Sequence, residues 1–199
     1  MSKARDIASA SPAPSTVSAT ELGYLDGVTS AVQTQLNSRA TLTGSETLTN
    51  KTLTSPAINT ATATGAILVA PEERTTVSAT AATGTINFDA VTQGLLYYTS
   101  NASANWTLNV RGNSSTTLNS ILTTGDAITV SFLVTQGSTA YYQTAFNIDG
   151  TTSGVTMEYS GGTVPAAGNA SSVDVYTYTI IKTASATYTV FGAGPIKYA

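Results

Sequence analysis

The feature that most limits the fold is a period-two alternation of apolar and polar residues that recurs from residue 84 onward. Thr85–Asp89, Trp106–Val110 and Thr187–Phe191 place large apolar side chains at every second position, with Thr, Asn or Asp between them. Such alternation is typical of strands with one buried and one exposed face, and turn dipeptides such as Asp149-Gly150 separate the segments. Eight or so short strands predict a mainly β domain, an antiparallel, jelly-roll-like β-sandwich.

The composition of individual segments predicts their places in this domain. Ala127–Val134 is the most apolar strand and should lie centrally in its sheet. Val173–Ile181 and Thr187–Phe191 are predicted to close the domain as an antiparallel pair. A helix is indicated only as a brief turn across residues 118–122, ended by Gly125.

A change of pattern near residue 67 predicts the start of the β domain, which we place at residues 67–199. Before it, apolar residues are too sparse to form a core. Residues 1–20, with Pro12 and Pro14 among Ser, Thr and Ala, are expected to be an arm that becomes ordered by docking on another component. A frayed terminus is the alternative. Residues 21–66 are predicted to be an oligomerisation stem.

The stem prediction starts from the spacing of apolar residues between positions 21 and 37. Steps of three and four separate Leu22, Leu25, Thr29, Val32 and Leu36. This is the spacing of a helix that buries one stripe against copies of itself. The helix proper is expected from about residue 29 or 30 to residue 39, with Leu22 and Leu25 on the approach to it. So short a helix is marginal alone; a small amphipathic helix on a globular core is the alternative.

Three Thr-Leu-Thr triplets follow, centred on Leu42, Leu48 and Leu53. One Leu per layer is too little for a monomeric core, whereas three chains around one axis would each contribute a Leu to every layer. The pattern therefore predicts a homotrimer. Its stem residues would be Leu22, Leu25, Val32, Leu36, Leu42, Leu48 and Leu53.

Two segments of the predicted stem have characteristic amino-acid sequences. The segments ELGYLDGVTSAVQTQL (21–36) and GSETLTNKTLTSPAI (44–58) resemble phrases that occur in this order in bacteriophage tail fibres and related virion structural proteins. The segments YYTSNASANWTLNVRGNSSTTLNSIL and VDVYTYTIIKTASATYTVF resemble domains of marine-phage structural proteins. The resemblance implies a virion component, made in the host cytoplasm and assembled as a homotrimer.

Three functions are compatible with that resemblance. The first is a short tail fibre or spike, whose arm (1–20) binds other virion proteins and whose β domain contacts polysaccharide or protein on the host surface. The second is a trimeric capsid decoration or cement protein, such as a head fibre. The third and least favoured is a polysaccharide depolymerase, which would need a carboxylate pair and a long repeated scaffold.

Composition argues against several other classes. Charged residues make up 10% of the chain, the net charge is −3 and the Lys and Arg residues are scattered, so we expect neither nucleic-acid nor membrane binding. The absence of His and Cys removes Ser-His-Asp, Cys-His and thiolate metal sites. We therefore expect no enzyme, no metal and no cofactor. The acids of the β domain, which are more often capping or solvated than a glycosidase pair, are Asp89, Asp126, Asp149, Glu158 and Asp174.

Aromatic residues are the candidates for contact with a receptor. In strands, the neighbours Tyr97 and Tyr98, and likewise Tyr141 and Tyr142, would point to opposite faces. One member of each pair is then available at the surface, and Trp106 could face either way. Exposed Tyr and Trp suit binding of sugars or proteins. Cross-strand packing or burial between subunits is the favoured alternative.

Overall fold

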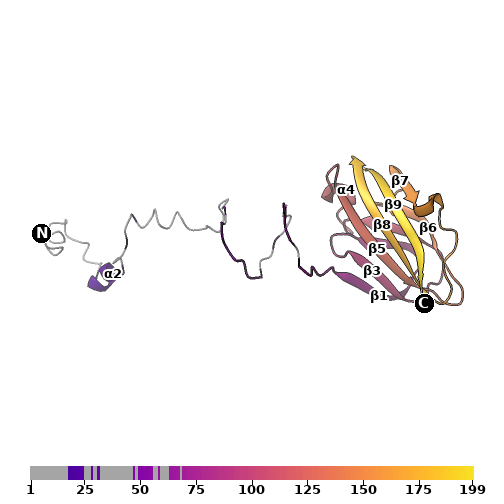
Figure 1. Cartoon of the computed structure of the whole chain (residues 1–199), viewed down its shortest axis with the longest axis horizontal. Coiled ribbons are helices and arrows are strands. Elements are labelled where there is room, and N and C mark those ends of the chain that lie inside the picture. Colours follow the sequence, from indigo (N-terminus) through magenta and orange to yellow (C-terminus); the bar gives the residue numbers. More distant parts are fainter. Residues whose placement is uncertain are drawn as a thin grey trace. The chain divides into compact units, whose positions relative to one another are not determined.

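The computed structural model describes residues 18–24, 28, 31, 47, 49–55, 58, 63–67 and 69–199. The chain divides into two units, Met1–Gly65 and Ala66–Ala199 (Figure 1). No helix of the described residues is long and apolar enough to span a membrane.

The first unit contains a short helix, α2 (Ala19–Gly23), that begins with a capping box. The backbone N–H and the hydroxyl of Ser18 donate to Oε2 of Glu21 at 2.6 and 2.8 Å, and the N–H of Glu21 donates back to Oγ of Ser18 at 3.2 Å. The sequence patterns did not indicate this helix, which contains Leu22, a residue predicted to lie on the approach to a later helix.

Most of the predicted stem lies outside the described residues. This holds for the helix expected between about residues 29 and 39. It also holds for Leu25, Val32, Leu36, Leu42 and Leu48. Leu53 is described, and 54% of it is exposed in the single chain.

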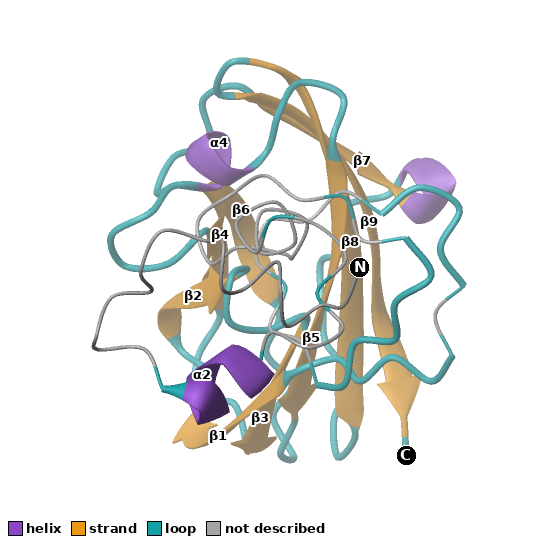
Figure 2. Cartoon of the chain, turned by 90° about the vertical axis from the view of Figure 1, so that its left-hand side faces the viewer, coloured by secondary structure: helices purple, strands orange, loops and turns teal. Residues whose placement is uncertain are grey.

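The described residues of the second unit form nine strands in two sheets. The strands are β1 (Thr75–Ala81), β2 (Gly84–Asp89), β3 (Leu95–Ser100), β4 (Trp106–Arg111), β5 (Ala127–Thr135), β6 (Gln143–Ile148), β7 (Val155–Tyr159), β8 (Val173–Ala184) and β9 (Thr187–Tyr198). The six-stranded sheet has the order β1-β3-β5-β8-β9-β7, and the three-stranded sheet has the order β2-β4-β6. Figure 2 shows the two sheets as separate layers.

Parallel pairing dominates this unit, so the predicted antiparallel, jelly-roll-like organisation is wrong for most of it. Strands β1, β3 and β5 are parallel neighbours, as are β2, β4 and β6, and β7 pairs parallel with β9. Only β8 makes antiparallel pairs, with β5 and β9. The chain alternates between the sheets from β1 to β6 and so makes three coils, each with one strand in each sheet.

The error has a physical cause. Period-two alternation looks the same in parallel and antiparallel strands, and short connections favour antiparallel hairpins within one sheet. Here the two-residue link between β1 and β2 joins strands of different sheets. A strand of the opposite sheet therefore takes the place of the helix that usually connects parallel neighbours.

The core lies between the two sheets. The inward side chains of β2, β4 and β6 meet those of β3, β5, β8 and β9 in one buried cluster. At its centre Trp106 packs edge-on against Phe132 and Tyr176, with ring centroids 5.7 and 6.0 Å apart. Such aromatic pairs stabilise a fold by about 0.5–1.5 kcal/mol beyond the area they bury.

Several local predictions are confirmed. Strand β5 is an interior strand, between β3 and β8, and β8 and β9 form the antiparallel pair. The helical turn is α4 (Leu118–Ile121), whose N-cap is Thr117. A turn at Asp149-Gly150, with φ of 52° and 84°, joins the bridged residues Ile148 and Thr151. Strand β1 is an addition that the sequence patterns did not indicate, and η1 (Ser160–Gly162) is a single turn after β7.

Candidate functional site

The outer face of the three-stranded sheet carries rows of like side chains. The register aligns Asn87 of β2 with Asn109 of β4, and Asn109 with Asn147 of β6. One step further along the strands, Asp89 lies opposite Arg111. In-register parallel strands stack identical residues in this way, and amide side chains can then bond along the row.

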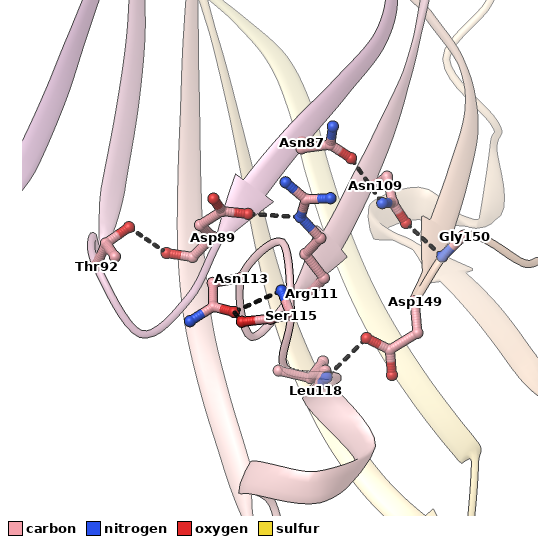
Figure 3. Close-up of polar contacts among 10 residues, drawn as sticks. All are labelled: Asn87, Asp89, Thr92, Asn109, Arg111, Asn113, Ser115, Leu118, Asp149 and Gly150. Carbon is pink, nitrogen blue, oxygen red and sulfur yellow. Dashed lines mark hydrogen bonds and ion pairs between the residues drawn. The ribbon is translucent and has the colours of Figure 1, made fainter.

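The hydrogen bonds of this face hold its side chains in fixed positions (Figure 3). Nδ2 of Asn109 donates to Oδ1 of Asn87 at 2.8 Å, and the N–H of Gly150 donates to Oδ1 of Asn109 at 2.7 Å. Nε of Arg111 donates to Oδ1 of Asp89 at 2.7 Å, with both side chains about a quarter to a third exposed. Because this ion pair engages only Nε, it leaves the two Nη groups of Arg111 for another acceptor.

A cavity of about 310 Å³ opens at the end of this face. Its walls are Asn109, Arg111, the turn Asp149-Gly150 and the loop 113–117. We call this cavity the polar pocket. Its loop turns tightly after Gly112, where a Cβ would lie 2.6 Å from the carbonyl oxygen of Thr116. Loop and turn thus form a wall of amide, hydroxyl and carboxylate groups around one guanidinium.

Asp149 binds the backbone at the start of α4, at the edge of the polar pocket. Its Oδ1 accepts from the N–H of Leu118 at 2.6 Å (Figure 3) and its Oδ2 from the N–H of Asn119 at 3.0 Å, so the carboxylate satisfies the first amides of α4. Both oxygens are already engaged, which suits a positioning role better than a catalytic base.

The remaining acids are spread over the β domain. Asp126 accepts from the N–H of Thr123, and Asp174 is buried among amide donors. Glu158 lies on β7, at an edge of the six-stranded sheet. Within the described part of the chain no group of three or more His, Cys, Asp or Glu residues could hold a metal ion.

The aromatic candidates are not brought together in one site. Trp106 is 1% exposed and lies in the core, so its predicted contact with a receptor is wrong for this fold. Tyr97 and Tyr98 do point to opposite faces. Tyr98 packs edge-on against Phe132 at 5.7 Å, and burial raises its pKa above the usual value. Tyr97 lies on the outer face of the six-stranded sheet.

The second tyrosine pair has a different setting. Tyr141 and Tyr142 precede β6 and lie outside any strand, so the alternation argument does not apply to them. Tyr141 is partly buried against the core. The backbone N–H of Tyr142 donates to Oδ1 of Asn105 at 3.0 Å.

The residues of the polar pocket were missed, although a signal for them exists in the sequence. The triplets Asn87-Phe-Asp89, Asn109-Val-Arg111 and Asn147-Ile-Asp149 repeat one pattern of Asn, apolar residue and charged residue. In each triplet the apolar residue is buried and its neighbours face outward. A repeat of this kind marks successive coils that present the same face.

Comparisons with protein-family models, with curated proteins and with solved structures found no match for this chain. Fold and site by themselves define a mainly β protein with two facing sheets and, in the part of the chain that the structure describes, the polar pocket on the outer face of the smaller sheet.

Proposed function

We propose that this chain is a structural protein of a bacteriophage virion, a homotrimeric short tail fibre or spike. Residues 1–20 attach it to other virion proteins, and the β domain contacts the host surface. The observation that carries the proposal is the order of the two stem phrases, 21–36 and 44–58, ahead of a charge-poor β domain.

The polar pocket supports a role in adsorption to a hydroxyl-rich ligand such as host polysaccharide. Sugars are bound by planar amide, carboxylate and guanidinium groups that are already oriented by other hydrogen bonds, because little side-chain entropy is then lost on binding. Asn109 and Arg111 are oriented in this way by Asn87 and Asp89. A saccharide hydroxyl could accept from the Nη groups of Arg111 and displace only solvent.

Two experiments test this proposal. Antibody against residues 84–199 is expected to label the tail of intact particles in electron micrographs. Label over the whole head would instead indicate the decoration protein, and absence of label would contradict a virion role.

The second experiment addresses the pocket. Purified full-length protein is expected to block adsorption of the phage to host cells, and Arg111→Gln should raise the half-blocking concentration about tenfold or more, as expected for a lost charge-assisted hydrogen bond. Arg74→Gln is the matched control, since Arg74 is exposed before β1. Equal blocking by both variants would exclude the polar pocket as the contact.

A further inference from the structure

The outer face of the six-stranded sheet carries a continuous row of apolar side chains. The register aligns Val77 with Tyr97, Tyr97 with Leu133, Leu133 with Val175 and Val175 with Ile196. These five residues, which we call the apolar row, cross five neighbouring strands from β1 to β9. Alternation with buried neighbours such as Phe132 and Tyr176 places the row on the side of the sheet away from the core.

The same face is hollowed beside the apolar row. A cavity of about 450 Å³ is lined by Leu95, Tyr97, Leu133, Val175 and other outward residues of β3, β5, β8 and β9. Tyr198 forms one wall and is 59% exposed in the single chain. An aromatic ring beside a hollow of this kind is a typical element of a protein interface.

Charge is missing from the part of this face that the apolar row crosses, whereas the sixth strand, β7, presents Glu158 beside the exposed Phe191 of β9. Strands β1, β3, β5, β8 and β9 contain only three charged residues, Asp174, Lys182 and Lys197. Asp174 and Lys182 are buried on the core side, and Lys197 aligns with Asp174, on the side opposite Ile196 and Tyr198. The other outward residues are mostly Thr, Ser and Ala. A solvated sheet face usually carries charged residues, because about 25% of an ordinary domain is charged.

The absence of charge along the apolar row favours a second copy of this chain as the binding partner. A charged partner, whether protein or polysaccharide, would lose its hydration here without a counter-charge to replace it. The same five strands of a second copy present neither charges to desolvate nor like charges to repel on this face. Symmetric assemblies also place the same patch of each copy around a common axis.

The area of the face fits such an interface. Val77 is 63% exposed, Ile196 47% and Tyr198 59%. Taken with the partly exposed Tyr97, Leu133 and Val175, these side chains leave roughly 450 Å² of apolar surface, on the basis of about 150–250 Å² for a large side chain. That is about half of the roughly 800 Å² that each partner buries in a standard interface, and the surrounding hydroxyl residues would supply the rest.

We infer that the apolar row is the surface through which copies of this chain associate, with the row of each copy facing a common axis. This inference rests on the homotrimer of the proposed function and assigns to the β domain the surface that holds the trimer together. The stem would then only have to fix the register of the three chains relative to one another.

The test is the mass of the full-length protein by native mass spectrometry and light scattering at micromolar concentration. Wild type is expected to contain three chains, and Val77→Lys and Ile196→Lys are expected to be monomers. Both positions are exposed in the single chain, so the new charge is solvated and the domain folds, as circular dichroism would verify. Val91→Lys is the matched control, because Val91 is 50% exposed but lies in the loop after β2.

The outcomes separate the two proposals. If wild type and both variants contain three chains, the apolar row is not the interface, while the trimer of the proposed function stands. If wild type is a monomer, both are wrong.

Cysteine labelling gives a second readout, since the chain contains no Cys. Maleimide should modify Ile196→Cys at least tenfold more slowly than Val91→Cys at high protein concentration, and at similar rates on dilution to single chains. Protection that persists in the monomer would mean that another segment of the same chain covers the row, which would overturn the inference.

Discussion

Removal of the buried carboxylate of Asp174 should be among the most damaging single changes to the β domain. Asp174 lies near the start of β8, is 0% exposed and accepts three hydrogen bonds. The donors are Nε2 of Gln136 at 3.1 Å, and the backbone N–H and Nδ2 of Asn169 at 2.9 and 2.7 Å. Gln136 in turn donates to the carbonyl oxygen of Tyr141 at 2.6 Å. One carboxylate thus ties the loop before β8 to the segment before β6.

The magnitude follows from the donors that lose a partner. In Asp174→Ala the backbone N–H and Nδ2 of Asn169, both partly buried, lose this acceptor, while Nε2 of Gln136 keeps the oxygen of Tyr141. At about 1–3 kcal/mol for each of these two groups, the free energy of unfolding should fall by about 2–6 kcal/mol. In Asp174→Asn one oxygen remains and the amide of Asn169 can rotate to accept from the new NH₂, so the loss should be about 1–2 kcal/mol.

The assay is equilibrium unfolding in urea, followed by the fluorescence of Trp106, the single and buried tryptophan. The control is Asp126→Ala, an exposed acid that accepts one hydrogen bond from the N–H of Thr123, with an expected loss below about 1 kcal/mol. An Asp174→Ala variant within 1 kcal/mol of wild type would refute the reasoning. A loss as large in Asp174→Asn as in Asp174→Ala would show that charge, not hydrogen bonding, matters there.

Two further predictions concern buried polar groups. Lys182→Met should lower the free energy of unfolding by about 2–3 kcal/mol, because Nζ donates to the carbonyl oxygens of Asn119 and Leu122 at 2.7 and 2.8 Å. The control is Lys197→Met, at an exposed position, which should change the free energy of unfolding by less than about 0.5 kcal/mol in the same urea assay. Burial raises the pKa of Tyr176 and Tyr178, and raises that of Tyr188 to about 12. Unfolded tyrosines release their protons near pH 10, so stability is intact below pH 10 and should then fall by up to about 4 kcal/mol per pH unit, at about 1.4 for each of the three. Urea midpoints at pH 9 and pH 11 check this; equal midpoints would mean that these hydroxyls ionise without unfolding.

The strands themselves could be predicted from sequence, but their partners could not. Alternation in segments such as Thr85–Asp89 reports which side chains are buried, and this information is local. Whether β3 pairs with β1 or with β4 depends on where the chain crosses to the other sheet, and the two-residue link after β1 does not encode that. The Asn triplets did contain the answer, since equal patterns on alternate strands indicate parallel coils in register.

Trp106 shows the same limit at the level of a single residue. The alternation of Trp106–Val110 assigns Trp106, Leu108 and Val110 to one face, yet it does not say which face the opposite sheet covers. The burial of Leu108 and Val110, both 0% exposed, decides it, and Trp106 follows them into the core. By contrast, Asn109 is only 6% exposed although it faces outward, because the turn after β6 bonds to it.

The two outer faces of the domain would have complementary uses in the proposed trimer. Because the sheets face each other across the core, the apolar row and the polar pocket lie on opposite outer surfaces. Association through the apolar row would therefore leave three pockets free and directed away from the axis. A surface polysaccharide repeats its sugar units, so three linked pockets can bind it together, and linked sites of this kind gain about 10²–10⁴ in avidity.

This arrangement predicts how the Val77→Lys variant behaves in adsorption. As a monomer with an intact pocket, it should bind an isolated saccharide unit as wild type does, yet block adsorption only at concentrations at least about a hundredfold higher. Arg111→Gln should weaken binding in both measurements. Blocking by monomeric Val77→Lys at the wild-type concentration would show that each pocket acts alone, and that the trimer serves attachment to the particle rather than recognition of the host.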